Sequence, residues 1–325
     1  MQKYGLFVRK VNSCFGFRNL QVDLVNLKMI QPTYLQKNDT VAIVSTARKI
    51  SLPEIQPAIE LLKSWGLKVV VGETIGFEEH QFAGTDAQRT ADFQKMLDNQ
   101  KIKAIWCARG GYGTVRIIDK LDFTEFKKNP KWMIGYSDIT VLHNHIHNLG
   151  FQTLHATMPL DVEKNQKKAL NSLKKSLFGK PISYEINASE ENKTGKTEGI
   201  LVGGNLSMLY SLLGSETSIK TDGKILFIED LDEYLYHIDR MLMNLKRNGY
   251  FNHLKGLVVG GMTDMHDNAI PFGKNAKKII LDIVSEFNFP IVFDFPAGHL
   301  KDNRALVFGR KVELEVSEEK TSIKF

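Results

Sequence analysis

The segment Lys131-Trp132-Met133-Ile134-Gly135-Tyr136-Ser137-Asp138-Ile139-Thr140 carries the strongest structural signal in the chain. Its first part, to Tyr136, is an apolar run that predicts a buried parallel strand, and a helix is predicted from Asp138 to Leu149. Ser137 alone stands between the strand and the helix. Ligands of open α/β sheets bind at the carboxyl ends of the strands. The pattern therefore puts a serine hydroxyl where such a sheet meets its ligand.

Strands and helices alternate on the amino-terminal side of this segment. Alternation of this kind favours a doubly wound, mostly parallel sheet, which we expect to be flavodoxin-like. Gly66 is a predicted helix C-cap, since glycine adopts the backbone conformation that ends helices. We predict strands over residues 41–44, 67–71 and 104–107 and helices over residues 54–65, 86–98 and 114–121.

The sequence turns polar and rich in lysine between residues 161 and 196, which indicates a domain junction. Beyond it, residues 305–316 alternate as antiparallel strands do, so the second domain is expected to be mixed α/β. The first residues lack sustained periodicity and are expected to be a dispensable extension. The predicted divisions are an extension (1–28), a first domain (29–165), a linker (166–195) and a second domain (196–325).

Charge and cysteine content narrow the function classes. Lys and Arg exceed Asp and Glu by 43 to 37, but the basic residues are scattered in pairs instead of forming a stripe, so no nucleic-acid partner is expected. The two cysteines, Cys14 and Cys107, form no disulfide framework and suit a reducing compartment. No apolar run is long enough to span a bilayer. We therefore expect a cytoplasmic protein.

Ser137 is a candidate nucleophile, because hydrolases expose a reactive serine on a sharp strand-to-helix turn. The backbone N–H of Asp138 would then point at the developing oxyanion. The usual G-x-S-x-G motif is incomplete, since Ile139 replaces its last glycine. The alternative interpretation is that Ser137 is only a helix N-cap.

The run Arg109-Gly110-Gly111-Tyr112-Gly113 follows another predicted strand. Adjacent glycines let the backbone approach a ligand and present N–H groups to negative charge. The run is a candidate second oxyanion donor or phosphate cradle, or a plain tight turn. Nucleotide-binding spacings are missing, so no nucleotide cofactor is expected.

His299 lies in a Pro- and Gly-containing turn after a predicted strand, which suits a general base. Glu229 ends a buried apolar run, where a carboxylate needs a partner, although Asp230 and Asp232 compete for the same role. The alternatives are a structural turn histidine and a salt-bridging acid. Three further histidines alternate on one predicted helix and are expected to be exposed or capping, not metal ligands: His143, His145 and His147.

Taken together, these segments resemble the LD-carboxypeptidase family of serine peptidases, from about Asp39 to Val316. Six motifs occur in the order of that family. They are Arg109-Gly110-Gly111-Tyr112-Gly113, Ile134-Gly135-Tyr136-Ser137-Asp138-Ile139-Thr140, Gly203-Gly204-Asn205-Leu206-Ser207, Leu226-Phe227-Ile228-Glu229-Asp230, Ile238-Asp239-Arg240-Met241-Leu242 and Pro296-Ala297-Gly298-His299.

The resemblance implies a Ser137–Glu229–His299 triad divided between two domains. It also implies an oxyanion hole made by the N–H groups of Asp138 and Gly111 (or Gly110), and neither a metal nor another cofactor. Gly110, Tyr112 and Arg240 are the candidate substrate-binding residues. The implied reaction is hydrolysis of the amide between an L-centre and a terminal D-amino acid, with a murein tetrapeptide as substrate and a homodimer as the assembly.

Some family positions differ, as in His155-Ala156-Thr157-Met158, and they leave substrate preference open. One rival is a peptidase that detoxifies aminoacyl-nucleotide antibiotics of the microcin C type. A second is a non-catalytic binding protein on the same fold. A third is a metal hydrolase built on Asp264, His266 and Asp267.

Overall fold

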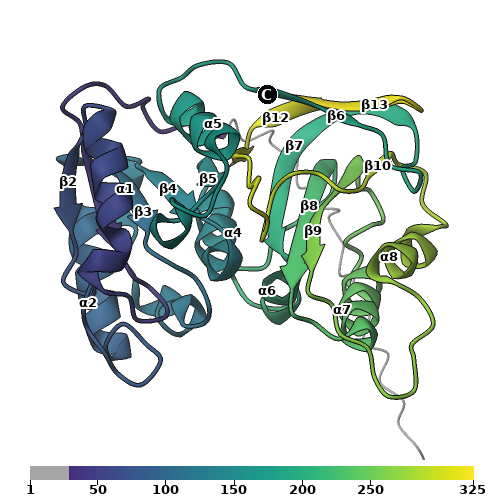
Figure 1. Cartoon of the computed structure of the whole chain (residues 1–325), viewed down its shortest axis with the longest axis horizontal. Coiled ribbons are helices and arrows are strands. Elements are labelled where there is room, and N and C mark those ends of the chain that lie inside the picture. The colour runs from purple at the N-terminus through teal and green to yellow at the C-terminus, as the bar shows by residue number, and fades with distance from the viewer. Residues whose placement is uncertain (1–28) are drawn as a thin grey trace, which may run out of the picture.

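Two β-sheets lie side by side in residues 29–325, the part of the chain that this computed structural model describes (Figure 1). The extension expected over residues 1–28 lies outside the described residues. The first sheet has six strands and is mostly parallel, and the second has seven strands and is mixed. The α/β architecture expected from the sequence is confirmed.

The first sheet has the order β11-β5-β4-β3-β1-β2. Its strands β1 to β5 run parallel in the flavodoxin-like order, as predicted. Both faces of β3 and β4 are covered, which explains their nearly continuous apolar sequence. The bounds are β1 Thr40–Val44, β2 Lys68–Val71, β3 Ile102–Cys107, β4 Trp132–Gly135, β5 Thr153–His155 and β11 Leu306–Phe308.

Helices cover this sheet where the apolar spacing predicted them. Helix α1 turns Ile55, Ile59 and Leu62 toward the sheet. The helix predicted over residues 114–121 is instead two short 3₁₀ turns. The N–H of Thr114, which would start that helix, donates to the Asp138 carboxylate. The bounds are α1 Leu52–Ser64, α2 Asp86–Asp98, η1 Thr114–Arg116, η2 Ile118–Lys120, α3 Thr124–Lys128, η3 Ser137–Ile139, α4 Thr140–Asn148 and η4 Pro159–Asp161.

The second sheet has the order β10-β9-β8-β7-β12-β13-β6. Strands β7 to β10 are parallel, whereas β12, β13 and β6 pair antiparallel. The alternation over residues 305–316 predicted the antiparallel strands β11 and β12, but not β6 or β13. The bounds are β6 Ser183–Asn187, β7 Gly195–Asn205, α6 Leu206–Ser211, β8 Lys224–Leu231, α7 Leu235–Arg247, β9 Gly256–Thr263, α8 Ala276–Val284, β10 Ile291–Val292, β12 Lys311–Val316 and β13 Lys320–Lys324.

The region expected to be a linker, residues 166–195, contains regular structure. It holds helix α5, Lys167–Leu177, and the edge strand β6 of the second sheet. The chain also returns to the first sheet after the second one, because β11 pairs with the edge of β5. An unpaired strand edge exposes N–H and C=O groups, and β11 covers this one. The two sheets are therefore joined by more than one chain segment.

The second sheet approaches the first at helix α4. The N–H of Asn205, at the end of β7, donates to Thr140 Oγ1 over 3.0 Å. A Cβ atom on Gly204 would collide with the Thr140 side chain, so only glycine allows this contact. This junction holds the carboxyl ends of the parallel strands in both sheets close to residue 137.

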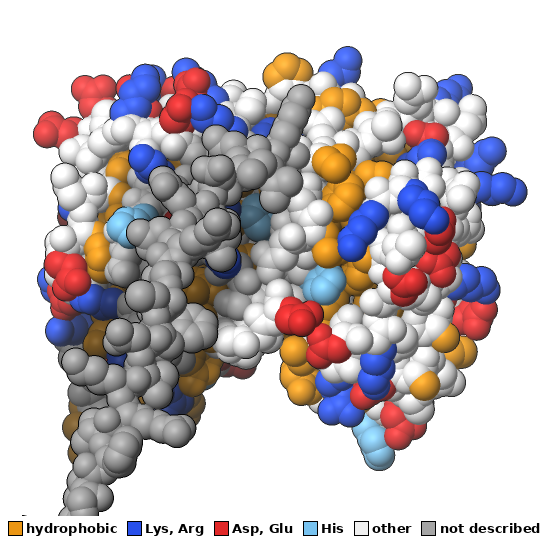
Figure 2. All heavy atoms as spheres, turned by 180° about the vertical axis from the view of Figure 1, so that it is seen from behind, with side chains coloured by type: hydrophobic (Ala, Val, Ile, Leu, Met, Phe, Trp, Pro, Cys, Tyr) orange, Lys and Arg blue, Asp and Glu red, His pale blue; other side chains and the backbone are white. Residues whose placement is uncertain are grey.

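No helix in residues 29–325 is long and apolar enough to cross a membrane. Figure 2 shows the rear face, part of which lies behind the grey atoms. Around the edges of the visible part, basic side chains are mixed with acidic ones. This mixture matches the scattered lysine pairs of the sequence.

Candidate active site

Ser137 lies on the turn between β4 and α4 with a backbone φ of +62°. A non-glycine residue rarely takes this left-handed conformation, and such strain gathers at functional sites. Gly135 allows the turn to close, because a Cβ atom there would lie 2.8 Å from the Ile139 side chain. Ser137 is 9% exposed, so its hydroxyl faces a recess instead of bulk water.

The glycine run packs directly against this turn. A Cβ atom on Gly110 would lie 3.1 Å from Ser137 Oγ and 3.4 Å from the Asp138 nitrogen. The buried Asp138 carboxylate accepts a hydrogen bond from Thr114 N over 2.9 Å and so ties the end of the run to the turn. Burial raises the pKa of Asp138. Within residues 29–325, the N–H groups of Gly111 and Asp138 donate to no protein acceptor.

Glu229 and His299 form a buried carboxylate–imidazole pair. Glu229 Oε2 is 2.7 Å from His299 Nδ1 and also accepts the backbone N–H of His299 over 3.3 Å. Gly298 makes this possible, since it has φ +101° and a Cβ atom there would lie 2.7 Å from Glu229 Oε2. A carboxylate on Nδ1 keeps the proton there and leaves Nε2 free to accept one.

The electrostatics of His299 follow from this contact. Burial lowers the pKa of His299, but the charge of Glu229 and its hydrogen bond outweigh burial and hold that pKa above 6.5. The Tyr136 ring lies edge-on to the imidazole, with ring centroids 4.8 Å apart. The Tyr136 hydroxyl donates to Asp161 Oδ2 over 2.9 Å. Nothing in the sequence pattern marked Tyr136 or Asp161 as neighbours of His299.

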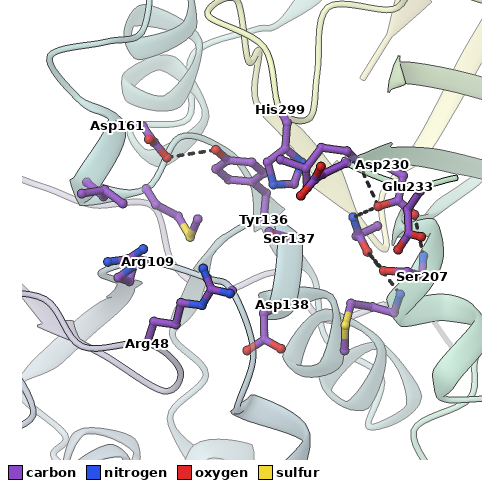
Figure 3. A pocket seen from close by; sticks show the side chains of 18 residues that line it. Arg48, Arg109, Tyr136, Ser137, Asp138, Asp161, Ser207, Asp230, Glu233 and His299 are labelled. Atoms are coloured by element: carbon purple, nitrogen blue, oxygen red, sulfur yellow. Dashed lines mark hydrogen bonds between the residues drawn. The ribbon is translucent and has the colours of Figure 1, made fainter. Parts of the chain in front are cut away.

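These residues meet in a cleft of about 480 Å³ between the two sheets (Figure 3). Ser137, His299, Gly110, Gly111 and Asp138 all line it, and Glu229 lies directly behind His299. Ser137 Oγ makes no hydrogen bond to His299 in the described residues. Catalytic contacts of this kind often tighten only when substrate is bound.

Two of the expected substrate-binding residues do not line the cleft. Arg240 is exposed on α7, with its guanidinium 5.4 Å from the centre of the Tyr236 ring. Tyr112 turns toward Phe82, with ring centroids 6.1 Å apart. The placement of Arg240 differs from the expectation because helix spacing fixes which face a residue takes, but not which cleft that face borders.

The cations in the cleft are instead Arg48 and Arg109. They follow β1 and β3, which are neighbours in the first sheet. The carboxyl ends of neighbouring parallel strands share one sheet edge, and that signal could have identified both arginines. The opposite wall carries Asp230 and Glu233 (Figure 3), and Asp232 also lines the cleft.

The Asp230 side chain is held in the wall of the cleft by two hydrogen bonds. Its carboxylate accepts Asn205 Nδ2 over 2.8 Å and Ser207 N over 2.9 Å. Burial is the main cause that raises the pKa of Asp230 to about 7, and the charge of Glu229 is the second cause. Asp230 is therefore held by donors other than a histidine, whereas Glu229 is the acid in contact with His299.

The metal alternative finds no support in the described chain. No group of three or more His, Cys, Asp or Glu side chains there is arranged to hold a metal ion. His266 Nε2 lies 2.5 Å from Oδ1 of Asp232, and Asp232 lines the cleft whereas His266 does not.

Comparison with known proteins identifies the family of this chain. Residues 41–156 match the LD-carboxypeptidase N-terminal domain, and residues 198–314 match the LD-carboxypeptidase C-terminal domain. The probable murein peptide carboxypeptidase of Bacillus subtilis is 36% identical over 303 residues, which cover 90% of this chain and 93% of that protein. The chain belongs to the LD-carboxypeptidase family.

Two further members of the LD-carboxypeptidase family extend the comparison. The muramoyltetrapeptide carboxypeptidase of Oxalobacter formigenes has a crystal structure that matches with a TM-score of 0.80 and 27% identity, covering 88% of this chain and 98% of that one. The microcin C7 self-immunity protein MccF of Escherichia coli is 25% identical over 299 residues, covering 82% of this chain and 86% of that protein.

Proposed function

We propose that this chain is a serine carboxypeptidase that hydrolyses the amide between an L-centre and a terminal D-amino acid. Ser137 is the nucleophile, His299 the general base and Glu229 the residue that orients the base. The observation that carries the proposal is the 2.7 Å pair of Glu229 and His299 in the same cleft as the strained Ser137 turn. Family membership and the free N–H groups at Gly111 and Asp138 support it.

In the proposed reaction, Ser137 Oγ attacks the carbonyl carbon while its proton moves to His299 Nε2. The tetrahedral oxyanion is stabilised by the N–H groups of Asp138 and Gly111. The C–N bond then breaks, and His299 gives its proton to the leaving nitrogen. Water attacks the acyl ester, its proton goes to His299, and the serine is regenerated. Glu229 stabilises the imidazolium in both half-reactions.

The substrate we propose is a cytoplasmic murein tetrapeptide, from which D-alanine is released during peptidoglycan recycling. The names of the relatives from Bacillus subtilis and Oxalobacter formigenes support this substrate class. The cytoplasmic location rests on the cysteine content and the family resemblance, and a homodimeric assembly rests on the resemblance alone. An aminoacyl-sulfamoyl adenosine, as a mimic of microcin C, is the comparison substrate.

Three variants test the triad by mass spectrometry of the products from a purified tetrapeptide. Ser137→Ala and His299→Ala should each remove nearly all release of D-alanine, and the double variant should be little worse, because a triad acts as a unit. Glu229→Ala should be impaired less severely. Multiplicative losses, or substantial activity in folded Ser137→Ala, would show that the nucleophile lies elsewhere. Faster turnover of the aminoacyl-sulfamoyl adenosine would favour the detoxifying role.

A further inference from the structure

The two arginines of the cleft have no carboxylate partner. Neither Arg48 nor Arg109 forms an ion pair within residues 29–325. Arg109 donates one N–H to the backbone oxygen of Lys49 over 3.0 Å, and its Nε is buried without an acceptor. Guanidinium groups bind carboxylates through two parallel hydrogen bonds, so an arginine pair without a carboxylate partner in a cleft suits a bound carboxylate.

Arg48 is fitted to the site by a neighbouring glycine. A Cβ atom on Gly111, which has φ +108°, would lie 2.5 Å from Arg48 Cδ and 2.7 Å from its Nε. The arginine side chain therefore lies across the glycine run next to Ser137. Any side chain at residue 111 would push Arg48 away from the nucleophile.

An acid without an ion-pair partner in residues 29–325 and two apolar side chains from the same short segment also line the cleft. Asp161 accepts the Tyr136 hydroxyl and forms no ion pair in the described chain. Met158 and Leu160 line the cleft beside it. Figure 3 shows Arg48, Arg109 and Asp161 on one side of Ser137. A carboxylate site, an ammonium site and an apolar contact are the three elements that a small α-amino acid requires.

The other side of the cleft has the opposite charge. Figure 3 shows Asp230 and Glu233 across Ser137 from the arginines, and Asp232 also lines the cleft. Like charges repel strongly where water is partly excluded, so a terminal carboxylate is disfavoured there. The charge distribution thus sets the direction in which a peptide lies over Ser137.

We propose that Arg48, Arg109 and Asp161 form the leaving-group subsite and bind a small zwitterionic α-amino acid. Arg48 and Arg109 bind its carboxylate, Asp161 binds its ammonium group, and Met158 and Leu160 contact its side chain. This inference rests on the proposed carboxypeptidase function. On this proposal, the enzyme binds the terminal carboxylate of the peptide before cleavage and keeps the free amino acid bound as a product.

Binding of the free product tests the subsite without turnover. Calorimetric titration of the full-length Ser137→Ala variant should detect D-alanine, weaker binding of D-lactate, which lacks the ammonium group, and the weakest binding of D-alaninamide, which lacks the carboxylate. Adding Arg109→Gln or Arg48→Gln should weaken D-alanine binding about 10- to 100-fold, the range for loss of a charged hydrogen bond. Arg109→Lys should restore part of the affinity, because it keeps the charge but not the fork.

Arg247→Gln is the matched control, since Arg247 is an exposed arginine of α7 that does not line the cleft. It should bind D-alanine as the parent does. Equal affinity for D-alanine and D-alaninamide, no detectable D-alanine binding, or unchanged binding in both folded arginine variants would overturn the subsite.

A kinetic comparison separates this inference from the proposed function. Wild-type enzyme should cleave a peptide ending in free D-alanine faster than the same peptide ending in D-alaninamide, and Arg109→Gln should reduce that preference. Equal rates of cleavage of both peptides would contradict the proposed subsite but not the proposed triad. Binding of D-alanine together with undiminished hydrolysis by Ser137→Ala would instead contradict the proposed triad and support the subsite.

Discussion

Glu229 and His299 set the protonation state of the proposed base. The carboxylate is fully buried, and it reaches only the Nδ1 side of the ring and the backbone N–H of the same residue. Because the charge and hydrogen bond of Glu229 prevail over burial, the pKa of His299 stays above 6.5. A general base works only when neutral, so this contact determines the pH at which catalysis begins.

Glu229→Gln should therefore change the pH profile of kcat/KM. In the wild type, activity should rise with pH through a pKa above 6.5, as His299 loses its proton. Removing the carboxylate charge leaves burial, which lowers the pKa, so the rising limb should move to lower pH. The plateau should also fall, because the ring tautomer is no longer held. A limb that stays in place in the folded variant would mean that another group titrates.

At the scale of single elements, the loop from Pro296 to Arg304 presents His299 by means of one glycine. Gly298 N donates to Asn303 Oδ1 over 2.9 Å, and this closes the loop beneath the histidine. The left-handed φ of Gly298 and its contact with Glu229 both require the absence of a side chain.

Gly298→Ala should lower kcat at least about tenfold by displacing His299 from Glu229. The matched control is Gly273→Ala, since Gly273 has φ +82° but no atom within 4 Å of the point that a Cβ atom would occupy. Both variants carry the strain of a left-handed alanine, about 1 kcal/mol. The value of kcat is measured by steady-state kinetics for both variants. If kcat falls equally in the two, backbone strain and not the Glu229 contact explains the loss.

Helix α4 carries a second consequence of burial. Its histidines were expected to be exposed or capping, but His143 and His147 are buried. The helix lies between the two sheets, so both of these positions face protein. Burial lowers the pKa of His143 to about 4 and that of His147 to about 3. His143 is bonded to Thr153 and Gly135, whereas His147 Nδ1 has no partner in the described chain.

Stability should therefore fall as the pH drops. A histidine with a lowered folded pKa binds fewer protons than the unfolded chain, so its contribution is present above pH 6.5 and is lost between pH 6.5 and about 4. In that pH window, each such histidine lowers the free energy of unfolding by roughly 1 kcal/mol per pH unit. His147→Leu should reduce the loss, measured by urea unfolding at pH 7 and pH 5. An unchanged pH dependence would contradict this assignment.

Considered as a whole, the molecule is tied together by chain segments that cross between the sheets. Strand β11 belongs to the first sheet, although it follows β6 to β10 of the second sheet along the chain. Ala305 and Val307 are fully buried in the core on the α1 side of the first sheet. The first sheet is therefore incomplete without residues from the carboxyl-terminal part.

A fragment of residues 29–165, the first domain expected from sequence, should thus fail to fold cooperatively. It lacks β11, so the edge of β5 would be exposed and Leu154 would lose its partner Val307. Residues 29–325 should unfold in one transition monitored by circular dichroism. A fragment with a sharp thermal transition would show that β11 is dispensable for the first sheet.

Local pattern alone predicted strands β1 to β4, helices α1, α2 and α4 and the serine turn. These features depend on side-chain periodicity and glycine positions within a few residues, which the chain order carries directly. The six family motifs likewise marked Ser137, Glu229 and His299 before any geometry was known. The expectation of two domains came from the polar, lysine-rich stretch between residues 161 and 196, and the alternation over residues 305–316 indicated antiparallel strands in the second domain.

Only the tertiary structure decided which loops meet. Arg48 and Arg109 converge because β1 and β3 are neighbours in the sheet, and Asp161 joins them through Tyr136. Arg240 lies outside the cleft, although its motif matched the family. The return of β11 to the edge of β5 arises from contacts between residues far apart in sequence. Periodicity records which face of an element is buried, but not which distant element buries it.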